Sequence, residues 1–316
     1  MNYIGIDLGG TNIAVGIVDK TGHILAETFE PTPVGQPCEE YITRMTTCID
    51  RLLNTTRLRL EDMEAIGVGI PGIVIESLGL VAQCTNLAWY NVPFLSLLRS
   101  AFPVPVRMGN DADLAALAEH MVGAGAGCNS SVLITLGTGV GGGIIINGQP
   151  WSGAFGQAGE IGHSILVADG IPCRCGRNGC MEQYCSATAL IRNARQICEA
   201  FPQNAMVRMA GGNLDNLTAK IVIDAARDGD PWALRVFNRY THYLALAVDS
   251  VINIINPEII LIGGGISQAG SFLLDAVRAQ VPSHEKGVSR PISRIELAAL
   301  RNGAGIIGAA MLAKQH

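Results

Sequence analysis

The sequence predicts an α/β protein with two related domains, and three observations support this. The stretches IDLGGTNIAVGIVDKTG (6–22) and ITLGTGVGGGIIINGQP (134–150) share one order of features: strand, Leu-Gly, a turn of glycine and threonine, strand, second turn. A repeat at this separation indicates two copies of one supersecondary unit. Strand patterns are followed by helical patterns in both halves. The chain has 316 residues, 48% of them hydrophobic and 16% charged, which suits a folded globule large enough for two domains.

The elements of the first half follow from alternation, helical periodicity and turn residues. The sequence predicts strands at Tyr3–Leu8, Ile13–Asp19, Ile24–Phe29, Ala65–Ile70 and Val104–Met108. It predicts helices at Glu39–Asn54 and Asp111–Met121. These segments, joined by the final helix at about 303–316, form a predicted small domain over 1–122.

The second half repeats the pattern. It predicts strands at Ser131–Leu136, Val140–Ile146 and Glu258–Ile262, and helices at Pro231–Ile255 and about Gly303–Lys314. The glycine- and alanine-rich stretch 123–129 is where we expect the chain to cross between domains, since such residues suit a hinge. The predicted large domain covers 123–302.

Composition limits the possible partners and compartment. The net charge is −5 without a long basic run, which argues against a nucleic-acid surface. We expect no secretory signal and no membrane span, because no apolar stretch has the required flanks or length. The expected location is the cytoplasm, where most of the nine cysteines would stay reduced and buried.

Two glycine turns at matching places in the repeat, DLGGTN (7–12) and LGTGVGGG (136–143), favour phosphate binding. Glycine lets backbone N–H groups approach a phosphate closely, and Thr11, Asn12 and Thr138 add side-chain donors. A nucleotide held between two domains is therefore expected. The matches to GxGxxG at 137–142 and 67–72 lack the following helix of a dinucleotide site, so we reject that interpretation. Asp7 either caps its turn or holds Mg²⁺.

Four polar residues and one tryptophan are further candidates for a substrate site. Asn110 and Asp111 follow a strand and precede a helix, so they are either N-caps or a hydroxyl-activating pair in which Asp111 takes the proton. Glu160 and Glu182 are surface charges, metal ligands or sugar-binding groups. Trp89 is either a core residue or a platform for a sugar ring.

The segment EIGHSILVADGIPCRCGRNGCMEQ (160–183) concentrates three cysteines and a histidine. A Cys₃His set is an ordinary structural zinc site with four protein ligands and no open position for water. The CxC spacing is tighter than the usual CxxC. Such modules also occur in nucleic-acid binders, but the acidic balance argues against that class. We expect the metal to order the loop and to anchor Glu160 and Glu182 at its two ends.

The motifs DLGGTN, GNDAD, LGTGVGGG, GAFGQAGEIGH and CRCGRNGCME together resemble the ROK family of sugar kinases and repressors, over essentially the whole chain. The resemblance implies an actin-like (ribonuclease H-like) ATPase fold, with ATP and sugar in an interdomain cleft. It implies Asp111 as general base and sugar contacts from Asn86, Asn110, Asp111, Glu160, His163 and Glu182. It implies phosphate or Mg²⁺ contacts from Asp7, Gly9, Gly10, Thr11, Gly137, Thr138 and Gly139, and adenine contacts from Gly264 and Gly265. It implies structural zinc on His163, Cys173, Cys175 and Cys180.

The implied activity is an ATP- and Mg²⁺-dependent hexose kinase, glucokinase-like, that acts on the sugar 6-hydroxyl. Fructose, allose, mannose or N-acetylmannosamine are alternative substrates, and a catalytically inactive sugar sensor is an alternative of another class. The resemblance also implies a homodimer. Family repressors carry a DNA-binding helix-turn-helix ahead of the first glycine motif, and we expect none here because that motif starts at Asp7. One departure is Asp113, where glucokinase-like members often have asparagine.

Overall fold

The computed structural model describes residues 1–281 and 293–315. The chain forms two compact units. Unit 1 contains Met1–Leu133, Gly143–Gly159 and Ala299–His316, and unit 2 contains Ile134–Gly142 and Glu160–Ala298. The division into domains 1–122 and 123–302 stays a prediction, and its residues 282–292 lie outside the described part.

Unit 1 is built on a five-stranded sheet with the order β3-β2-β1-β4-β8. Its strands are β1 (Asn2–Leu8), β2 (Asn12–Asp19), β3 (Ile24–Pro31), β4 (Met63–Ile70) and β8 (Val106–Asn110). Strands β1, β2 and β3 pair antiparallel as two hairpins. Strands β1, β4 and β8 pair parallel, so their carboxyl ends lie at one edge.

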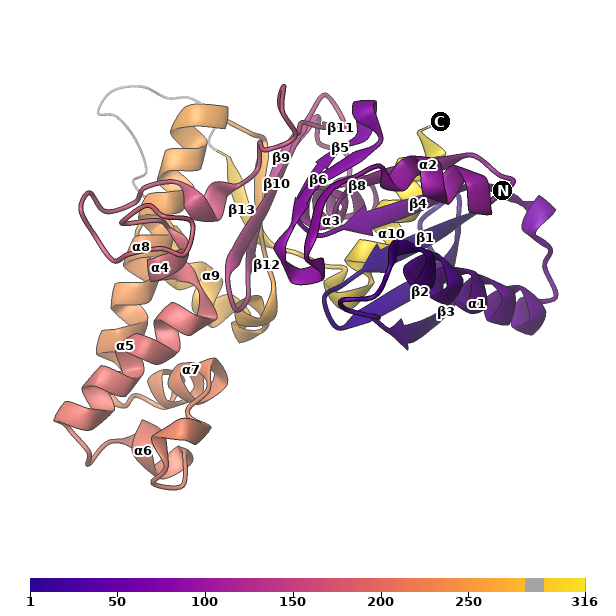
Figure 1. The fold of residues 1–316 in the computed structure, drawn as a ribbon. Helices are drawn as coiled ribbons and strands as arrows, with labels where there is room; N and C mark the ends of the chain where they lie inside the picture. Colours follow the sequence, from indigo (N-terminus) through magenta and orange to yellow (C-terminus); the bar gives the residue numbers. More distant parts are fainter. Residues whose placement is uncertain (282–292, 316) are drawn as a thin grey trace. The chain divides into compact units, whose positions relative to one another are not determined.

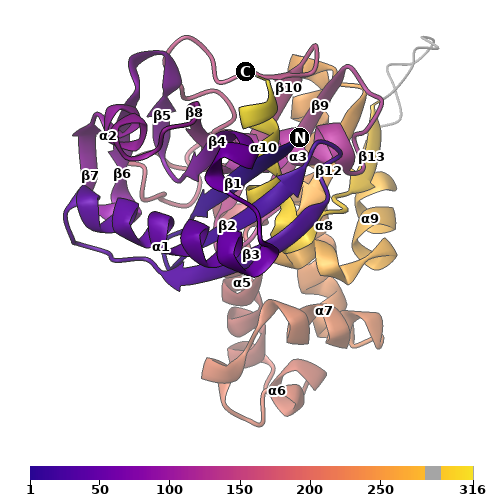
Figure 2. The same cartoon turned by 90° about the vertical axis from the view of Figure 1, so that its right-hand side faces the viewer.

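Helices cover both faces of this sheet, and strand alternation decides which side chains meet them (Figures 1 and 2). Helix α1 (Cys38–Thr56) shares a buried apolar cluster with Ile4 and Ile6 of β1. Gly5, between those isoleucines, faces α10 (Ala304–Lys314), and a Cβ there would overlap the carbonyl of Ile306. Gly67 of β4 meets α10 in the same way. These glycines allow the C-terminal helix to lie directly on the first and fourth strands.

A second, three-stranded sheet in unit 1 was not predicted. It has the order β5-β6-β7, from strands Ile73–Ile75, Leu80–Cys84 and Trp89–Val92. Helix α2 (Phe94–Ala101) follows it, and α3 (Asp111–Val122) follows β8. Three to five residues are too few for a period-two pattern to be read from sequence.

The second five-stranded sheet has the order β11-β10-β9-β12-β13, which matches the first sheet position by position. Its strands are β9 (Ser130–Leu136), β10 (Val140–Ile146), β11 (Gln149–Pro150), β12 (Ile259–Gly263) and β13 (Arg294–Leu297). Both sheets place their first strand centrally and pair it with the next strand through a glycine turn. The predicted repeat is confirmed at the level of topology.

The helices of unit 2 pack on one another, and most of them contact α8, a 25-residue helix (Figure 1). They are α4 (Glu182–Cys185), α5 (Ala187–Ala200), α6 (Ala205–Met209), α7 (Ala219–Arg227), α8 (Pro231–Ile255) and α9 (Ser271–Arg278). Tyr240 of α8 is fully buried, and its hydroxyl donates to the carbonyl of Cys185 at 2.7 Å.

Most predicted elements of both halves match the structure to within two residues. The strand predicted at Val104–Met108 is shifted by two residues at both ends, to Val106–Asn110, because Pro105 supplies no N–H for a ladder. The final helix begins at Ala304 after a short 3₁₀ turn, Arg301–Gly303. Within the described part of the chain, no helix combines the length and hydropathy that a bilayer-spanning segment requires.

Candidate functional site

In unit 1, the carboxyl edge of the parallel strands brings two predicted site acids together. Asp7 lies one residue before the end of β1, and Asp111 directly follows β8. Only β4 separates the two strands, so two interstrand spacings, roughly 10 Å, separate their backbones. The edge of a parallel sheet is where α/β proteins commonly place ligand-binding groups.

The start of α3 is fixed by Asn110. Its side-chain oxygen accepts hydrogen bonds from the N–H groups of Ala112 (2.8 Å) and Asp113 (3.1 Å). Its amide nitrogen donates to the carbonyl of Gly72 at 2.8 Å. The predicted N-cap is therefore confirmed for Asn110. Since one residue already caps the helix, Asp111 is not needed for that purpose.

Burial perturbs both carboxyl groups. Burial raises the pKa of Asp111, and its Oδ1 accepts from the N–H of Ala112 at 2.8 Å, which acts in the opposite direction. The pKa of Asp7 rises from 3.8 to about 6, first because of burial and second because of the charge on Asp111. A Cβ on Gly305, in the first turn of α10, would overlap the Asp7 carboxylate. Asp7 is thus held between the sheet and that turn.

The first glycine turn lies beside Asn86. The turn is closed by a hydrogen bond from Gly9 N–H to the carbonyl of Asn12 at 2.9 Å. A Cβ on Gly10 would lie 3.7 Å from the Asn86 side chain, so these two predicted site residues are neighbours. Thr11, Asn12 and Asn86 are exposed, as groups that meet a ligand need to be.

Trp89 belongs to the core of unit 1. It is 5% exposed, and its ring packs edge-on against Tyr41 at 4.8 Å and against Phe94 at 4.7 Å between centroids. The sugar-platform interpretation of Trp89 is wrong, because the side chain is almost completely buried in the apolar cluster of unit 1.

In unit 2, the second glycine turn holds the predicted sugar ligand Glu182. The N–H of Val140 donates to Glu182 Oε2 at 3.1 Å. A Cβ on Gly139 would overlap the same carboxylate, so glycine is required for this approach. Thr138 is exposed, and its carbonyl accepts from the hydroxyl of Thr188 at 2.7 Å. The turn is therefore fixed by α4 and α5.

A cavity of about 580 Å³ opens beside this turn. Gly137, Thr138 and Gly265 line it, as the sequence predicts for a nucleotide site. Gly264 has a φ of +81°, and a Cβ there would lie 2.5 Å from the carbonyl of Leu136, so the chain turns tightly against β9.

Helix α7 also lines the cavity, and the sequence analysis missed this contribution. Asp224 pairs with Lys220 and with Arg227, the latter at 2.9 Å. Their spacing of three and four residues could have revealed this charged face. All three residues line the cavity.

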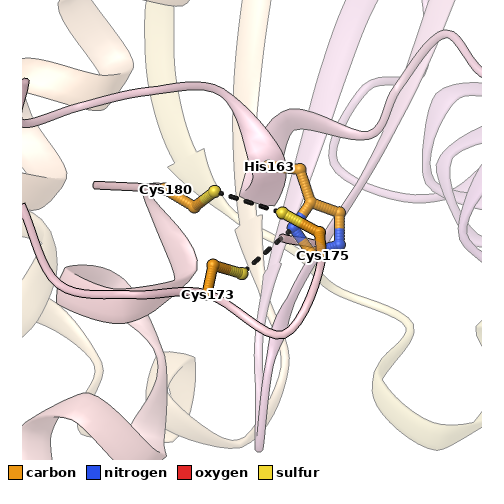
Figure 3. A group of neighbouring side chains, drawn as sticks. All are labelled: His163, Cys173, Cys175 and Cys180. Atoms are coloured by element: carbon orange, nitrogen blue, oxygen red, sulfur yellow. Dashed lines mark hydrogen bonds between the residues drawn. The ribbon is translucent and has the colours of Figure 1, made fainter. Parts of the chain in front are cut away.

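The four predicted metal ligands form one cluster (Figure 3). Their ligand atoms all lie within 4.8 Å of one another. His163 Nδ1 lies 3.7 Å from Cys173 Sγ, and Cys175 Sγ lies 3.5 Å from Cys180 Sγ. Three sulfurs and one imidazole at these separations fit a single tetrahedral ion with Zn–S of about 2.3 Å and Zn–N of about 2.0 Å.

Glu160 and His163 bracket a short 3₁₀ helix, Ile161–His163, at the start of the metal loop. Glu160 is exposed. The ring of His163 faces the three cysteines, so this residue belongs first of all to the candidate metal cluster. Of the predicted sugar ligands, unit 1 carries Asn86, Asn110 and Asp111, and unit 2 carries Glu160, His163 and Glu182.

Comparison with known families matches residues 3–316 to the ROK family. The chain is 35% identical over 315 residues to a glucokinase of Halalkalibacterium halodurans, covering 99% of this chain and 95% of that one. It is similar to a solved ROK family glucokinase from Streptomyces griseus in complex with glucose and AMPPNP, with 34% identity, a TM-score of 0.83 and 100% of both chains covered. A solved ROK family transcriptional regulator, a homolog of the E. coli MLC protein, gives a TM-score of 0.84 at 27% identity, over 98% of this chain and 77% of that one.

These similarities confirm the predicted actin-like ATPase fold. Because a glucokinase and a transcriptional regulator match the fold equally well, the fold alone does not separate phosphoryl transfer from transcriptional regulation. The distinction depends on the side chains of the site.

Proposed function

The chain belongs to the ROK family, and on this premise we propose that it is an ATP-dependent kinase that phosphorylates the 6-hydroxyl of glucose or a close hexose. The observation that carries the proposal is the pair of half-buried carboxyls, Asp7 and Asp111, at one edge of the unit 1 sheet. Burial raises the pKa of both acids, and the charge on Asp111 raises that of Asp7 further, which is typical of a functional site. The glucokinases at 35% identity over nearly the whole chain support the same activity.

Asp111 is the proposed general base. The hydrogen bond from Ala112 N–H engages its Oδ1, and the other oxygen would accept the proton of the sugar hydroxyl. The raised pKa makes this carboxylate a better proton acceptor than an exposed aspartate. Asn110 holds the helix start independently, so the orientation of Asp111 comes from a fixed backbone.

Asp7 is the proposed site for Mg²⁺, directly or through water. Its carboxylate is destabilised by burial and by Asp111, and a divalent cation would relieve both effects. Carboxylate oxygens suit Mg²⁺, and the exposed hydroxyl of Thr11 stands in the adjoining turn. When bound, Mg²⁺ neutralises charge on the phosphates.

The cavity beside Gly137–Gly139 is the proposed site for the adenosine end of ATP. Its volume of about 580 Å³ suits a nucleoside, and pockets for ligands of this size are commonly about 300–1,000 Å³. The backbone N–H groups of the turn would donate to phosphate oxygens. Arg227 and Lys220 add positive charge to the lining of the cavity, although both also pair with Asp224.

The Cys₃His cluster is the proposed structural zinc site. Its donor set and compactness fit the ion, and four protein ligands leave no position for a catalytic water. Zinc would fix the loop between Glu160 and Glu182. The homodimer that the family resemblance implies is a separate proposal, which sedimentation of the purified protein tests.

The competing function is a sugar sensor without turnover, which the glucokinase relatives do not favour. A panel of hexoses with ATP and Mg²⁺, followed by coupled ADP release, separates the two. We expect sugar-dependent ADP release that is greatest for glucose or a close hexose. Sugar binding by calorimetry without any ADP release would favour the sensor and refute the kinase.

A further inference from the structure

A buried aspartate ties the loop 151–159 to helix α3. Asp113 is 5% exposed, and its Oδ2 accepts a hydrogen bond from the hydroxyl of Ser152 at 2.9 Å. Asp113 lies two residues after Asp111, the proposed base. The loop and the base are therefore attached to one rigid helix.

Ser152 also closes the loop on itself. The N–H of Ala158 donates to the Ser152 carbonyl at 3.0 Å, so the residue bonds through both its side chain and its backbone. Ala158 is two residues from Glu160. Two hydrogen bonds thus connect the helix of the proposed base to the chain that leads into a proposed sugar ligand.

The rest of the loop has little stiffness of its own. Gly153, Gly156 and Gly159 have φ values of +72°, +69° and +91°, which glycine adopts without strain but does not enforce. A Cβ on Gly156 would lie 2.6 Å from the carbonyl of Val74, so this part of the loop packs on β5. Contacts, and not local chain preference, must hold the loop in place.

We propose that Asp113 and Ser152 are positioning residues that fix loop 151–159 and, through it, the approach of Glu160 to the sugar. This inference rests on the proposed function. The Asp113 carboxyl oxygen Oδ2 accepts a hydrogen bond, and the Ser152 hydroxyl donates it. The departure from the asparagine common in glucokinase-like members therefore has a partner within this chain.

The expected effect is on sugar binding and not on the chemical step. Asp111 is oriented by its own bond to Ala112 and by the Asn110 cap, neither of which involves Ser152. The proposed adenosine cavity is lined by residues of unit 2 alone. Loosening the loop should raise the KM for sugar, while the KM for ATP and kcat stay close to their original values.

The test is Ser152→Ala, which removes the donor and keeps the backbone bond. We expect the KM for the preferred hexose to rise about tenfold, equivalent to about 1.4 kcal/mol, with kcat and the KM for ATP changed less than about twofold. Ser152→Thr keeps a hydroxyl and should restore most of the affinity. Asp113→Asn keeps a side-chain oxygen that can accept from the Ser152 hydroxyl and should give a smaller rise than Ser152→Ala.

The matched control is Ser96→Ala, which removes an exposed hydroxyl whose bond to the Pro93 carbonyl is local. It should leave every kinetic constant unchanged. An unaltered sugar KM in Ser152→Ala, or a loss shared equally by sugar KM, ATP KM and kcat, would overturn the proposal. Absence of sugar-dependent ADP release in the unmodified protein would instead refute the proposed function.

Discussion

Replacing Asp7 with asparagine should stabilise the ligand-free protein while impairing the kinase. The pKa of Asp7 is 3.8 in the unfolded chain and about 6 when folded. Each pH unit between two such values corresponds to about 1.36 kcal/mol, so ionised Asp7 destabilises the fold by about 3 kcal/mol. Asp7→Asn removes that charge and keeps nearly the same shape.

The sign of the pH dependence follows from the two pKa values. Below pH 3.8 both states bind the proton, and the charge has no effect on stability. Between 3.8 and about 6 the unfolded chain ionises first, so the native protein loses stability as the pH rises. The gain from Asp7→Asn should therefore be about 3 kcal/mol at pH 8 and about half of that at pH 5.

Urea unfolding at these two pH values, followed by circular dichroism, measures the gain. Asp19→Asn is the control, because the hydroxyl of Thr21 and the N–H of His23 lower the pKa of Asp19, and its replacement should give no stabilisation. Mg²⁺ with a non-hydrolysable ATP analogue should stabilise the original protein more than Asp7→Asn. A destabilised Asp7→Asn, or a gain that is the same at both pH values, would show that the Asp7 charge is already compensated within the fold.

Three further outcomes are expected. Because Asp111 must be ionised to act as a base and its pKa is raised, kcat should fall as the pH is lowered, with a midpoint above pH 3.8. A kcat that stays constant down to pH 4 would contradict this. Elemental analysis of the purified protein should find about one zinc per chain. Cys175→Ser should lower this metal content and raise the KM for sugar, and full activity of metal-free protein would refute the structural role. Glu119→Ala should lower the free energy of unfolding by about 2–4 kcal/mol, because the buried Glu119 side chain accepts hydrogen bonds from Ala124 N–H at 3.0 Å and Leu300 N–H at 2.6 Å. A change of less than about 0.5 kcal/mol, measured by urea unfolding, would refute this.

Elements with local signals were predictable. The helix Pro231–Ile255 has the predicted bounds because Asp230 caps it, proline occupies its first position, and Asn256 ends it with a φ of 50°. The metal cluster was predictable for the same reason, since its four ligands lie within 18 residues of sequence. Loop closure over so short a distance makes spacing informative.

Features that depend on distant contacts were not predictable. Nothing near Gly5 indicates that a helix some 300 residues later lies against it. The α7 wall of the cavity and the bond between Asp113 and Ser152 likewise depend on how remote segments pack. Trp89 shows the converse, because its sequence neighbours suggested a ligand site while Tyr41 and Phe94 enclose it in the core.

The central claim is that Asp111 is the catalytic base, and Asp111→Asn tests it most directly. Asparagine is nearly isosteric, and Asn110 still caps the helix, so the thermal melt and the calorimetric sugar affinity should change little. Removal of the proton acceptor should lower kcat by about 10²–10⁴-fold. A kcat within a few-fold of the original, measured on folded and sugar-binding protein, would contradict the account and make Glu160 the next candidate.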